Sequence, residues 1–280
     1  MGFSDDNPRL SSENPEPEKS SRRRRFIVGV ILVLGVIGAL YAFLIEPNWI
    51  DVSRHHVRFG LSKPLKIAHL TDVHTTGLHW RERKLLELLQ QESPDVIVLT
   101  GDTLGDGFRY QEAAKVLQQL HAPLGVWLVR GNWEYFRPVP NDRAFYDSVG
   151  IRLLVNESAR LSDEVWLGGF DDAVMGRPRT DAVFPDTSSG KVLRLALFHS
   201  PVFYEQIAGK CDLALAGHTH GGQVCLPLYG PLWLPRGCGN YLEGWYKRET
   251  SQMYVSRGLG TSMIEVRFLC RPELAIITVE

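Results

Sequence analysis

The chain has 280 residues, 44% of them hydrophobic, and its 31 Lys and Arg against 32 Asp and Glu leave a formal net charge of −1. This length and apolar content suffice for one catalytic domain of about 215 residues with an ample core, plus an N-terminal appendage. The nearly neutral charge argues against a nucleic-acid-binding protein that relies on a broad basic face.

The N-terminal appendage has a polar part and an apolar part. Residues 1–21 are rich in Ser, Pro, Asn and Glu, and Arg22–Arg25 adds four successive positive charges. We therefore expect residues 1–25 to be a disordered tail with a basic end. Residues 26–45 contain no charge and no Pro, and twenty helical residues at 1.5 Å each match the ~30 Å hydrocarbon layer. Because they also lack the polar stripe of a core helix, they predict a transmembrane helix.

Flanking charges predict the orientation of this span. Lys19 and the run Arg22–Arg25 precede it, against three basic residues in the segment 46–63 that follows. We expect a single-pass protein of the bacterial inner (cytoplasmic) membrane, with the N-terminus inside and the catalytic domain outside. Residues 22–27 also read as an imperfect twin-arginine signal, but no Ala-x-Ala follows the apolar run, which favours a retained anchor over a cleaved signal.

After a linker and first strand region at residues 46–63, residues 64–280 mix period-2 and helix-period segments. Apolar runs predict the following strands: Leu65–Leu70, Asp95–Thr100, Gly125–Val129, Ile151–Val155, Val165–Gly169, Leu193–Phe198, Leu213–Ala216 and Leu274–Val279. Residues 80–91 and 111–120 each place leucines or alanines on one face and predict amphipathic helices that cover a sheet. The mixture predicts an α/β layered domain.

Residues that can bind metal stand at the ends of these strands. Five blocks occur in this order: Asp72-Val73-His74, Gly101-Asp102, Gly131-Asn132-Trp133-Glu134, His199, and Gly217-His218-Thr219-His220-Gly221-Gly222. They should gather along one edge of a sheet. Taken singly, each residue could be a helix N-cap, a turn residue or a hydrogen-bonded structural histidine. Five ordered blocks favour metal binding instead.

The kinds of side chain in these blocks indicate which metals they suit. Imidazoles, carboxylates and one carboxamide are borderline donors, which favour Mn first, with Fe or Zn as alternatives, over Ca or a largely hydrated Mg. Seven candidate ligands exceed the needs of one ion: Asp72, His74, Asp102, Asn132, His199, His218 and His220. We therefore expect two divalent ions about 3.5–4 Å apart, an arrangement that serves in-line displacement at phosphorus.

The ordered blocks closely resemble the calcineurin-like metallophosphoesterase superfamily, whose pattern is DxH, GD, GN(H)(D/E), H and GHxH, over residues 64–280. The resemblance implies a four-layer sandwich of two mixed β-sheets flanked by helices. It also implies phosphoester hydrolysis by a metal-bridging hydroxide, whose pKa the metals lower. By the same resemblance Asp72, His74 and His220 hold the first metal, and Asn132, His199 and His218 the second, with Asp102 bridging. Asp102, Asn132 and His218 would be catalytic.

Later segments are similar to a membrane-anchored branch of that superfamily, which includes UDP-2,3-diacylglucosamine pyrophosphatases and Bacillus-type exported phosphoesterases. These segments are residues 220–231, 255–262, 266–268 and 271–274. The similarity implies a lipid-linked pyrophosphate such as UDP-2,3-diacylglucosamine, a precursor in lipid A biosynthesis, cleaved to release UMP. The alternative is an exported, membrane-anchored phosphodiesterase or phosphatase. A UDP-lipid is cytosolic, so the substrate analogy conflicts with the predicted orientation, and the sequence leaves both open.

Trp133 departs from the superfamily pattern. Ester-cleaving members usually carry His there to protonate the leaving group, and indole cannot act as an acid. Either another group supplies the proton and Trp133 only packs, or the leaving group needs none, as in pyrophosphate cleavage.

Residues 224–246 are unusually apolar for a connection. Besides ordinary core, they could form a rim that seats acyl chains or rests on the bilayer; our candidates are Trp133, Leu226, Tyr229 and Trp233. Cys225 and Cys238 could pair across this loop if the domain is exported, the alternative being free thiols. The four cysteines lack the spacing of a zinc ribbon.

Two hypotheses without catalysis remain. A metal-binding pseudoenzyme could have lost turnover with the missing His, although all seven candidate ligands are present. A membrane tether would not need His199 or His220. Residues 181–191 are predicted to be a solvated loop, and the oligomeric state is left open.

Overall fold

The computed structural model describes residues 17–181, 183–184 and 192–280. Contacts within the chain divide it into two units, residues 1–40 and residues 41–280, which we describe separately. Residues 1–16 of the predicted tail, and all but three residues of the predicted loop 181–191, lie outside the described residues.

The first unit contains helix α1, Pro17–Leu40. Residues 17–25, which we expected in the tail, are helical; extending an existing helix needs no new nucleus, and Arg, Lys and Glu are good helix formers. Within the described chain, the helical stretch Ser21–Asn48 is long and apolar enough to cross a membrane. Over residues 21–40 its side chains are almost all exposed, unlike those of a core helix, and both a membrane anchor and an N-terminal signal segment have these properties.

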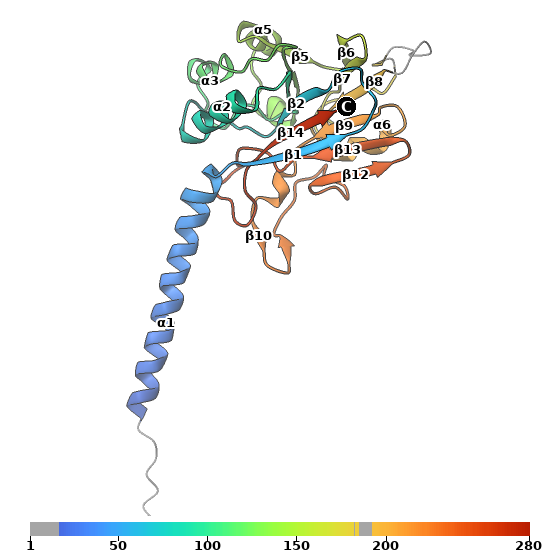
Figure 1. Ribbon diagram of the computed structural model, residues 1–280. Helices are drawn as coiled ribbons and strands as arrows, with labels where there is room; N and C mark the ends of the chain where they lie inside the picture. Colours follow the sequence, from blue (N-terminus) through green and yellow to red (C-terminus); the bar gives the residue numbers. More distant parts are fainter. Residues whose placement is uncertain (1–16, 182, 185–191) are drawn as a thin grey trace, which may run out of the picture. The chain divides into compact units, whose positions relative to one another are not determined.

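The second unit begins with a π-helical turn, η1 (Tyr41–Ile45), and a 3₁₀ turn, η2 (Glu46–Asn48). Its first large sheet has the strand order β1-β14-β2-β3-β4-β5. The strands are β1 (Asp51–Val57), β14 (Glu273–Val279), β2 (Leu65–Leu70), β3 (Val96–Leu99), β4 (Val126–Val129) and β5 (Ile151–Leu154). Only the β14–β2 pairing is antiparallel, so β2, β3 and β4 end at the same edge (Figure 1).

The second large sheet has the order β12-β13-β9-β8-β7-β6 and is also mixed. Its strands are β12 (Gly244–Arg248), β13 (Ser251–Val255), β9 (Leu213–Ala216), β8 (Leu193–Leu197), β7 (Val165–Gly169) and β6 (Glu157–Ser162). A separate hairpin pairs β10 (Cys225–Leu226) with β11 (Gly230–Pro231).

Alternation along the strands produces the layers. In β3, Val96 and Val98 face the second sheet, whereas Ile97 and Leu99 face helices. The helices on that side are α2 (Trp80–Glu92), α3 (Tyr110–Leu117) and α5 (Asp142–Ser148); a short helix α4 (Asn132–Phe136) follows β4. On the far side of the second sheet lie η3 (Pro201–Phe203) and α6 (Tyr204–Ile207). Because both faces of the central strands are buried, they read as continuous apolar runs. The predicted four-layer α/β sandwich is confirmed.

Some predicted elements differ in detail. The helix predicted to reach Leu120 ends at Leu117, and the next residues form tight i to i+3 turns. Strands β6, β12 and β13 were not predicted; β6 and β12 are edge strands whose exposed polar side chains carry little apolar signal, whereas β13 is a largely buried inner strand. All four cysteines are free, so the suggested pairing of Cys225 with Cys238 is wrong. Cys238 is buried, and the Cys225 thiol instead donates to the Gly221 carbonyl.

Candidate metal centre

The seven predicted ligands come together at the edge where strands of both large sheets end. Asp72 and His74 follow β2, Asp102 follows β3, and Asn132 opens α4 after β4. His199 follows β8, and His218 and His220 follow β9, His220 opening the 3₁₀ turn η4 (His220–Gly222). Six of the seven side chains are buried and Asn132 is half-buried. Their gathering follows from the shared direction of the strands that precede them.

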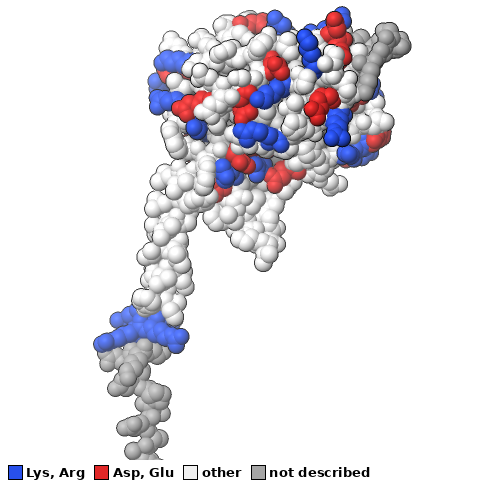
Figure 2. Space-filling view, in the orientation of Figure 1, with Lys and Arg blue, Asp and Glu red and all other residues white. Residues whose placement is uncertain are grey.

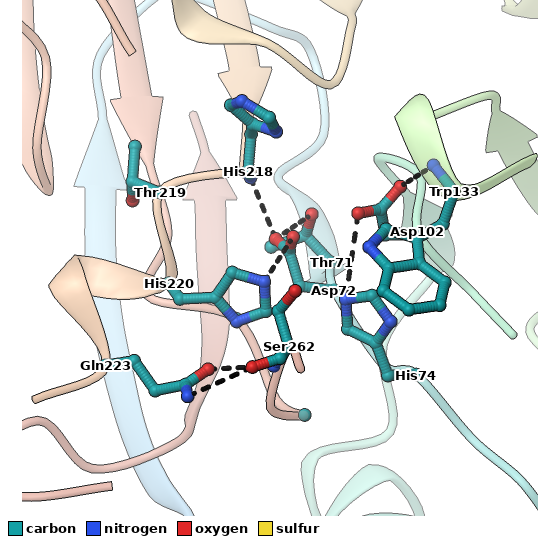
Figure 3. A network of polar contacts seen from close by, with 12 residues as sticks. Thr71, Asp72, His74, Asp102, Trp133, His218, Thr219, His220, Gln223 and Ser262 are labelled. Carbon is teal, nitrogen blue, oxygen red and sulfur yellow. Dashed lines mark hydrogen bonds and ion pairs between the residues drawn. The ribbon is translucent and has the colours of Figure 1, made fainter. Parts of the chain in front are cut away.

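Asp72, His74 and His220 form the first group (Figure 3). His220 Nε2 lies 3.2 Å from Asp72 Oδ1. The rings of His74 and His220 stack with their centroids 5.3 Å apart. Thr71 Oγ1 and the backbone N–H of His218 both donate to Asp72 Oδ2, which leaves Oδ1 directed at the imidazoles.

Asp102, Asn132, His199 and His218 form the second group. His199 Nε2 lies 3.3 Å from Asp102 Oδ2 and 3.0 Å from both Asn132 Oδ1 and His218 Nδ1. A single imidazole N–H cannot serve three such neighbours, and lone pairs that converge on one point suit a cation. Asp102 Oδ2 also lies 3.6 Å from His74 Nε2, so this carboxylate stands between the two groups.

Several buried polar atoms of the site have no hydrogen-bond partner. They are His74 Nε2 and Asp72 Oδ1, which accepts no hydrogen bond although His220 Nε2 is near; His220 Nδ1 is also without a partner, but it is the ring nitrogen opposite the one near Asp72. A buried polar group without a partner is costly, and clusters of such groups call for a missing ligand. Together with the borderline character of the donors, this fits divalent metal ions.

Two histidines are oriented by backbone carbonyls. The Thr100 carbonyl lies 2.7 Å from His199 Nδ1, and the Arg236 carbonyl lies 2.6 Å from His218 Nε2. A carbonyl only accepts, so in each ring that nitrogen donates its proton, and in the neutral ring that a metal requires the opposite nitrogen has a lone pair directed into the site. Such outer hydrogen bonds fix the tautomer and the ring orientation of metal-binding histidines.

Burial and neighbouring carboxylates set the protonation of the centre. Burial lowers the pKa of both His218 and His220 to about 4, so both rings are neutral near pH 7, as metal ligands must be. Burial raises the pKa of Asp102 to about 7, and the carboxylates of Glu134 and Asp72 add to the shift against the opposing effect of His199. The carboxylates are thus crowded in a way that bound cations would relieve.

The backbone around the centre is strained. Asp72, His74, Asp102, His218 and His220 all have φ between 45° and 71°, a left-handed conformation that is rare outside glycine. Such residues cluster where function requires a particular geometry. Two glycines of the blocks allow this close packing, because any side chain there would clash. A Cβ on Gly131 would lie 2.2 Å from Asp102 Oδ1, and one on Gly217 would lie 1.9 Å from Thr71 Oγ1.

Two supporting residues were not assigned a role from the sequence. The Glu134 carboxylate accepts the backbone N–H groups of Asp102, Thr103 and Gly131. It therefore ties the loop after β3 to the loop after β4. Glu134 stands three residues after Gly131, the spacing of a capping box, and that signal could have identified it.

Arg267 is the second supporting residue, and it is fully buried. Its guanidinium donates to backbone carbonyls of the following residues: His220, Arg257, Gly258, Gly260 and Cys270. It holds the loop after β9 against the loop after β13. No local sequence pattern reveals this role, because the partners are carbonyls that every residue has.

The proposed rim residues divide into two pairs. Trp133 and Trp233 line an open pocket of about 530 Å³ above the centre, together with Phe136, Val174, Met175 and Met263. The Trp133 ring meets that of His74 edge to face at 5.0 Å. Leu226 and Tyr229 do not line this pocket; they lie on the β10–β11 hairpin, where both are exposed.

Comparison with known proteins gives consistent results. Residues 65–222 match the model of the calcineurin-like phosphoesterase family. The metallophosphoesterase YkuE of Bacillus subtilis is 29% identical over 94% of this chain and 99% of its own length. Phosphodiesterase YaeI of Escherichia coli is 29% identical over 91% of this chain and 98% of its own. A transmembrane protein with a metallophosphoesterase domain from Danio rerio is 28% identical over 91% of this chain and 61% of its own length.

Proposed function

The chain belongs to the calcineurin-like phosphoesterase family, as its five blocks predicted, and we propose that it is a dinuclear enzyme acting on a lipid-linked substrate. That it is a metal-dependent phosphoesterase follows from the family and from its relatives. The number of metals, the role of each residue and the substrate are our proposals.

The position of Asp102 supports two metals. Its Oδ2 lies within 3.6 Å of His74 and within 3.3 Å of His199, one residue from each group. We assign Asp72, His74 and His220 to one ion, Asn132, His199 and His218 to the other, and Asp102 to both. Mn is our first candidate, with Fe and Zn as alternatives. Bound there, two divalent ions would polarise a phosphoryl oxygen and activate water.

In this proposal Trp133 orients the substrate rather than protonates it. The Trp133 backbone N–H donates to Asp102 Oδ1, and the Trp133 indole forms one wall of the pocket. Because indole cannot protonate a leaving group, we propose a scissile bond whose leaving group needs no acid. The phosphate monoester released from a pyrophosphate meets that condition near neutral pH.

An apolar pocket beside His220 supports a lipid-linked substrate. It has a volume of about 260 Å³, and its apolar lining includes Val224, Leu232, Trp233, Pro235, Met263, Ile264 and Val266. It shares Trp233, Pro235 and Met263 with the pocket above the centre. A substrate could thus place phosphorus at the metals and an acyl chain in the apolar pocket. UDP-2,3-diacylglucosamine is our first candidate.

A second candidate is an exported phosphodiesterase. The run Arg22–Arg25 before the apolar helix favours a single-pass anchor in the bacterial inner membrane with the catalytic domain outside, where a cytosolic UDP-lipid is absent. The relative YaeI is named a phosphodiesterase.

The deciding experiment compares three substrates with the Mn-loaded full chain in detergent: UDP-2,3-diacylglucosamine, its deacylated counterpart and an alkyl phosphodiester. A strong preference for the first supports the primary proposal, and equal rates on all three contradict it. Trp233→Ala should selectively reduce turnover of the acylated substrate. Trp80→Ala is the matched control, since Trp80 is 63% exposed against 62% for Trp233 but lines neither pocket.

A further inference from the structure

Leu228 occupies an unusual position at the tip of the β10–β11 hairpin. Its side chain is entirely exposed, and its φ of 65° lies in the left-handed region. Glycine or asparagine is the usual choice at such a turn position. A leucine there gains nothing from burial within the chain and adds backbone strain. Folding alone therefore does not explain this residue, which suggests that the tip contacts something else.

Other exposed apolar residues lie beside this tip. On the hairpin and its continuation they are Leu226, Tyr229, Leu232 and Trp233; on the neighbouring loop they are Met263, Ile264 and Leu269. We call these seven residues, with Leu228, the apolar end. Residues 224–235 contain no Lys, Arg, Asp or Glu, and neither do residues 258–264. Figure 2 shows the hairpin as an uncharged projection, whereas the upper part of the same face carries many charges.

Hydrogen bonds join the two parts of the apolar end. Cys225 N–H donates to the Phe268 carbonyl, and Phe268 N–H donates to the Gln223 carbonyl, which forms a short bridge between hairpin and loop. The Gln223 side chain adds bonds to the backbone of Ser262 and Ile264. The hairpin is thus held in a defined position on the unit of residues 41–280.

The same loop also holds the point where the chain enters this unit. Arg267 N–H donates to the Ala42 carbonyl, and the rings of Tyr41 and Phe268 meet edge to face. The buried carboxylate of Glu46 accepts the N–H groups of Leu269 and Cys270. Residues 41–46 belong to the apolar helical stretch that ends at Asn48. The loop of the apolar end therefore contacts the end of that stretch.

We propose that the apolar end is a second membrane contact, which inserts into the interfacial layer of the bilayer that holds the N-terminal helix. This inference rests on the proposed membrane anchoring. An apolar surface with one Trp and one Tyr, interrupted by the exposed Glu265 beside Ile264, suits the headgroup level, where amphipathic rings are favoured and a charge stays hydrated. Because residues 42 and 46 are hydrogen-bonded to residues 267–270, the chain enters this unit beside that surface.

The contact would have a consequence for the site. Trp233 and Met263 belong both to the apolar end and to the pocket above the candidate metal centre. With the apolar end inserted, the pocket would open at the membrane surface. A lipid-anchored phosphate could then reach the metals without leaving the bilayer, and a soluble ester would enter from the water side.

The test uses the full chain in vesicles of phosphatidylcholine and phosphatidylglycerol. Leu228→Cys carries an environment-sensitive fluorophore, and Asp163→Cys is the matched control, since the Asp163 side chain is 93% exposed in the β6–β7 turn. The unsubstituted chain, treated identically, corrects for labelling of the four native thiols. Unchanged turnover of a chromogenic phosphodiester with Mn²⁺ shows that each labelled chain is folded.

We expect the probe at position 228 to shift to shorter wavelength and to lose emission to spin-labelled lipids, and the probe at position 163 to respond only to aqueous iodide. Equal exposure to iodide at both positions would overturn the proposal. A shift at position 228 without lipid quenching would also overturn it, because a protein partner or a second copy would then cover the surface. The readout needs no lipid hydrolysis, so a chain that fails on UDP-2,3-diacylglucosamine can still show insertion.

Discussion

Replacing Glu134 with Gln tests whether one buried carboxylate holds the candidate metal centre together. Glu134 Oε2 accepts the N–H groups of Asp102 at 2.9 Å and Gly131 at 2.8 Å, and Oε1 accepts that of Thr103 at 2.9 Å. A glutamine can place its carbonyl oxygen at the first position and keep two of these bonds. Its NH₂ group then faces the Thr103 N–H, so one buried donor loses its acceptor.

Each hydrogen bond to a charged group contributes about 1.5–3 kcal/mol. We therefore expect Glu134→Gln to lower the free energy of unfolding by about that amount, measured by denaturant titration of the full chain in detergent. Because Asp102 directly precedes Thr103, whose N–H loses its acceptor, metal affinity should fall about 10–100-fold, as for other outer-shell changes. Glu157→Gln is the control; Glu157 pairs with Arg143 at the surface and should matter little. If the two variants have the same metal affinity and stability, the proposed tie is refuted.

Three further predictions follow from the described geometry. Asp102→Asn keeps an acceptor for the Trp133 N–H but removes the shared charge; metal content by mass spectrometry should fall from two ions to one or none, and two retained ions with normal turnover would contradict the bridging role. Trp133→His should raise turnover of alkyl phosphodiesters by at most the ~10²–10⁴-fold of general acid catalysis and barely change that of a pyrophosphate. Equal gains on both substrates would show that the new histidine does not act by protonating the leaving group. Glu273→Gln should destabilise the fold at pH 7 and less at acidic pH. Although burial opposes ionisation, Arg257 and hydroxyl donors lower the pKa of Glu273 below its usual 4.5. The stability that its charge contributes is therefore present above pH 4.5 and is lost as the pH falls through the folded-state pKa. If the difference in unfolding free energy between Glu273→Gln and the unsubstituted chain is the same at pH 7 and at acidic pH, the charge is not responsible.

The layered fold was predictable because alternate residues of a single strand face different layers, and both sets are apolar. In β3, Val96 and Val98 face the second sheet while Ile97 and Leu99 face the helices, so the run is apolar throughout, with Asp95 before it and Thr100 after it. The gathering of Asp72, Asp102 and the histidines was predictable for a related reason. Parallel strands end at one edge, and polar residues that directly follow several such strands must meet there.

Other parts of the structure depend on contacts that leave no local pattern. The positions of Leu226 and Tyr229 illustrate this: both belong to an apolar segment near His220 in sequence, but a hairpin carries them away from the pocket, whereas Trp233 returns to it. Hydrophobic composition indicated an apolar surface without showing which residues face the metals. The left-handed backbone at Asp72 or His218 was equally invisible, since neither residue is a glycine.

The two supports of the centre show the same limit and a common physical logic. Glu134 binds only donors, namely backbone N–H groups and the Tyr146 hydroxyl, while Arg267 binds backbone carbonyls. No ion pair joins either of them to an oppositely charged side chain among the described residues. Loops that direct their N–H groups inward need an anion, and loops that direct carbonyls inward need a cation, because an unpaired buried peptide group is costly. The loops after β3 and β4, which carry Asp102 and Asn132, are therefore held by a carboxylate. The loop that carries His220 is held by a guanidinium, so a change at either support should loosen its own half of the centre first.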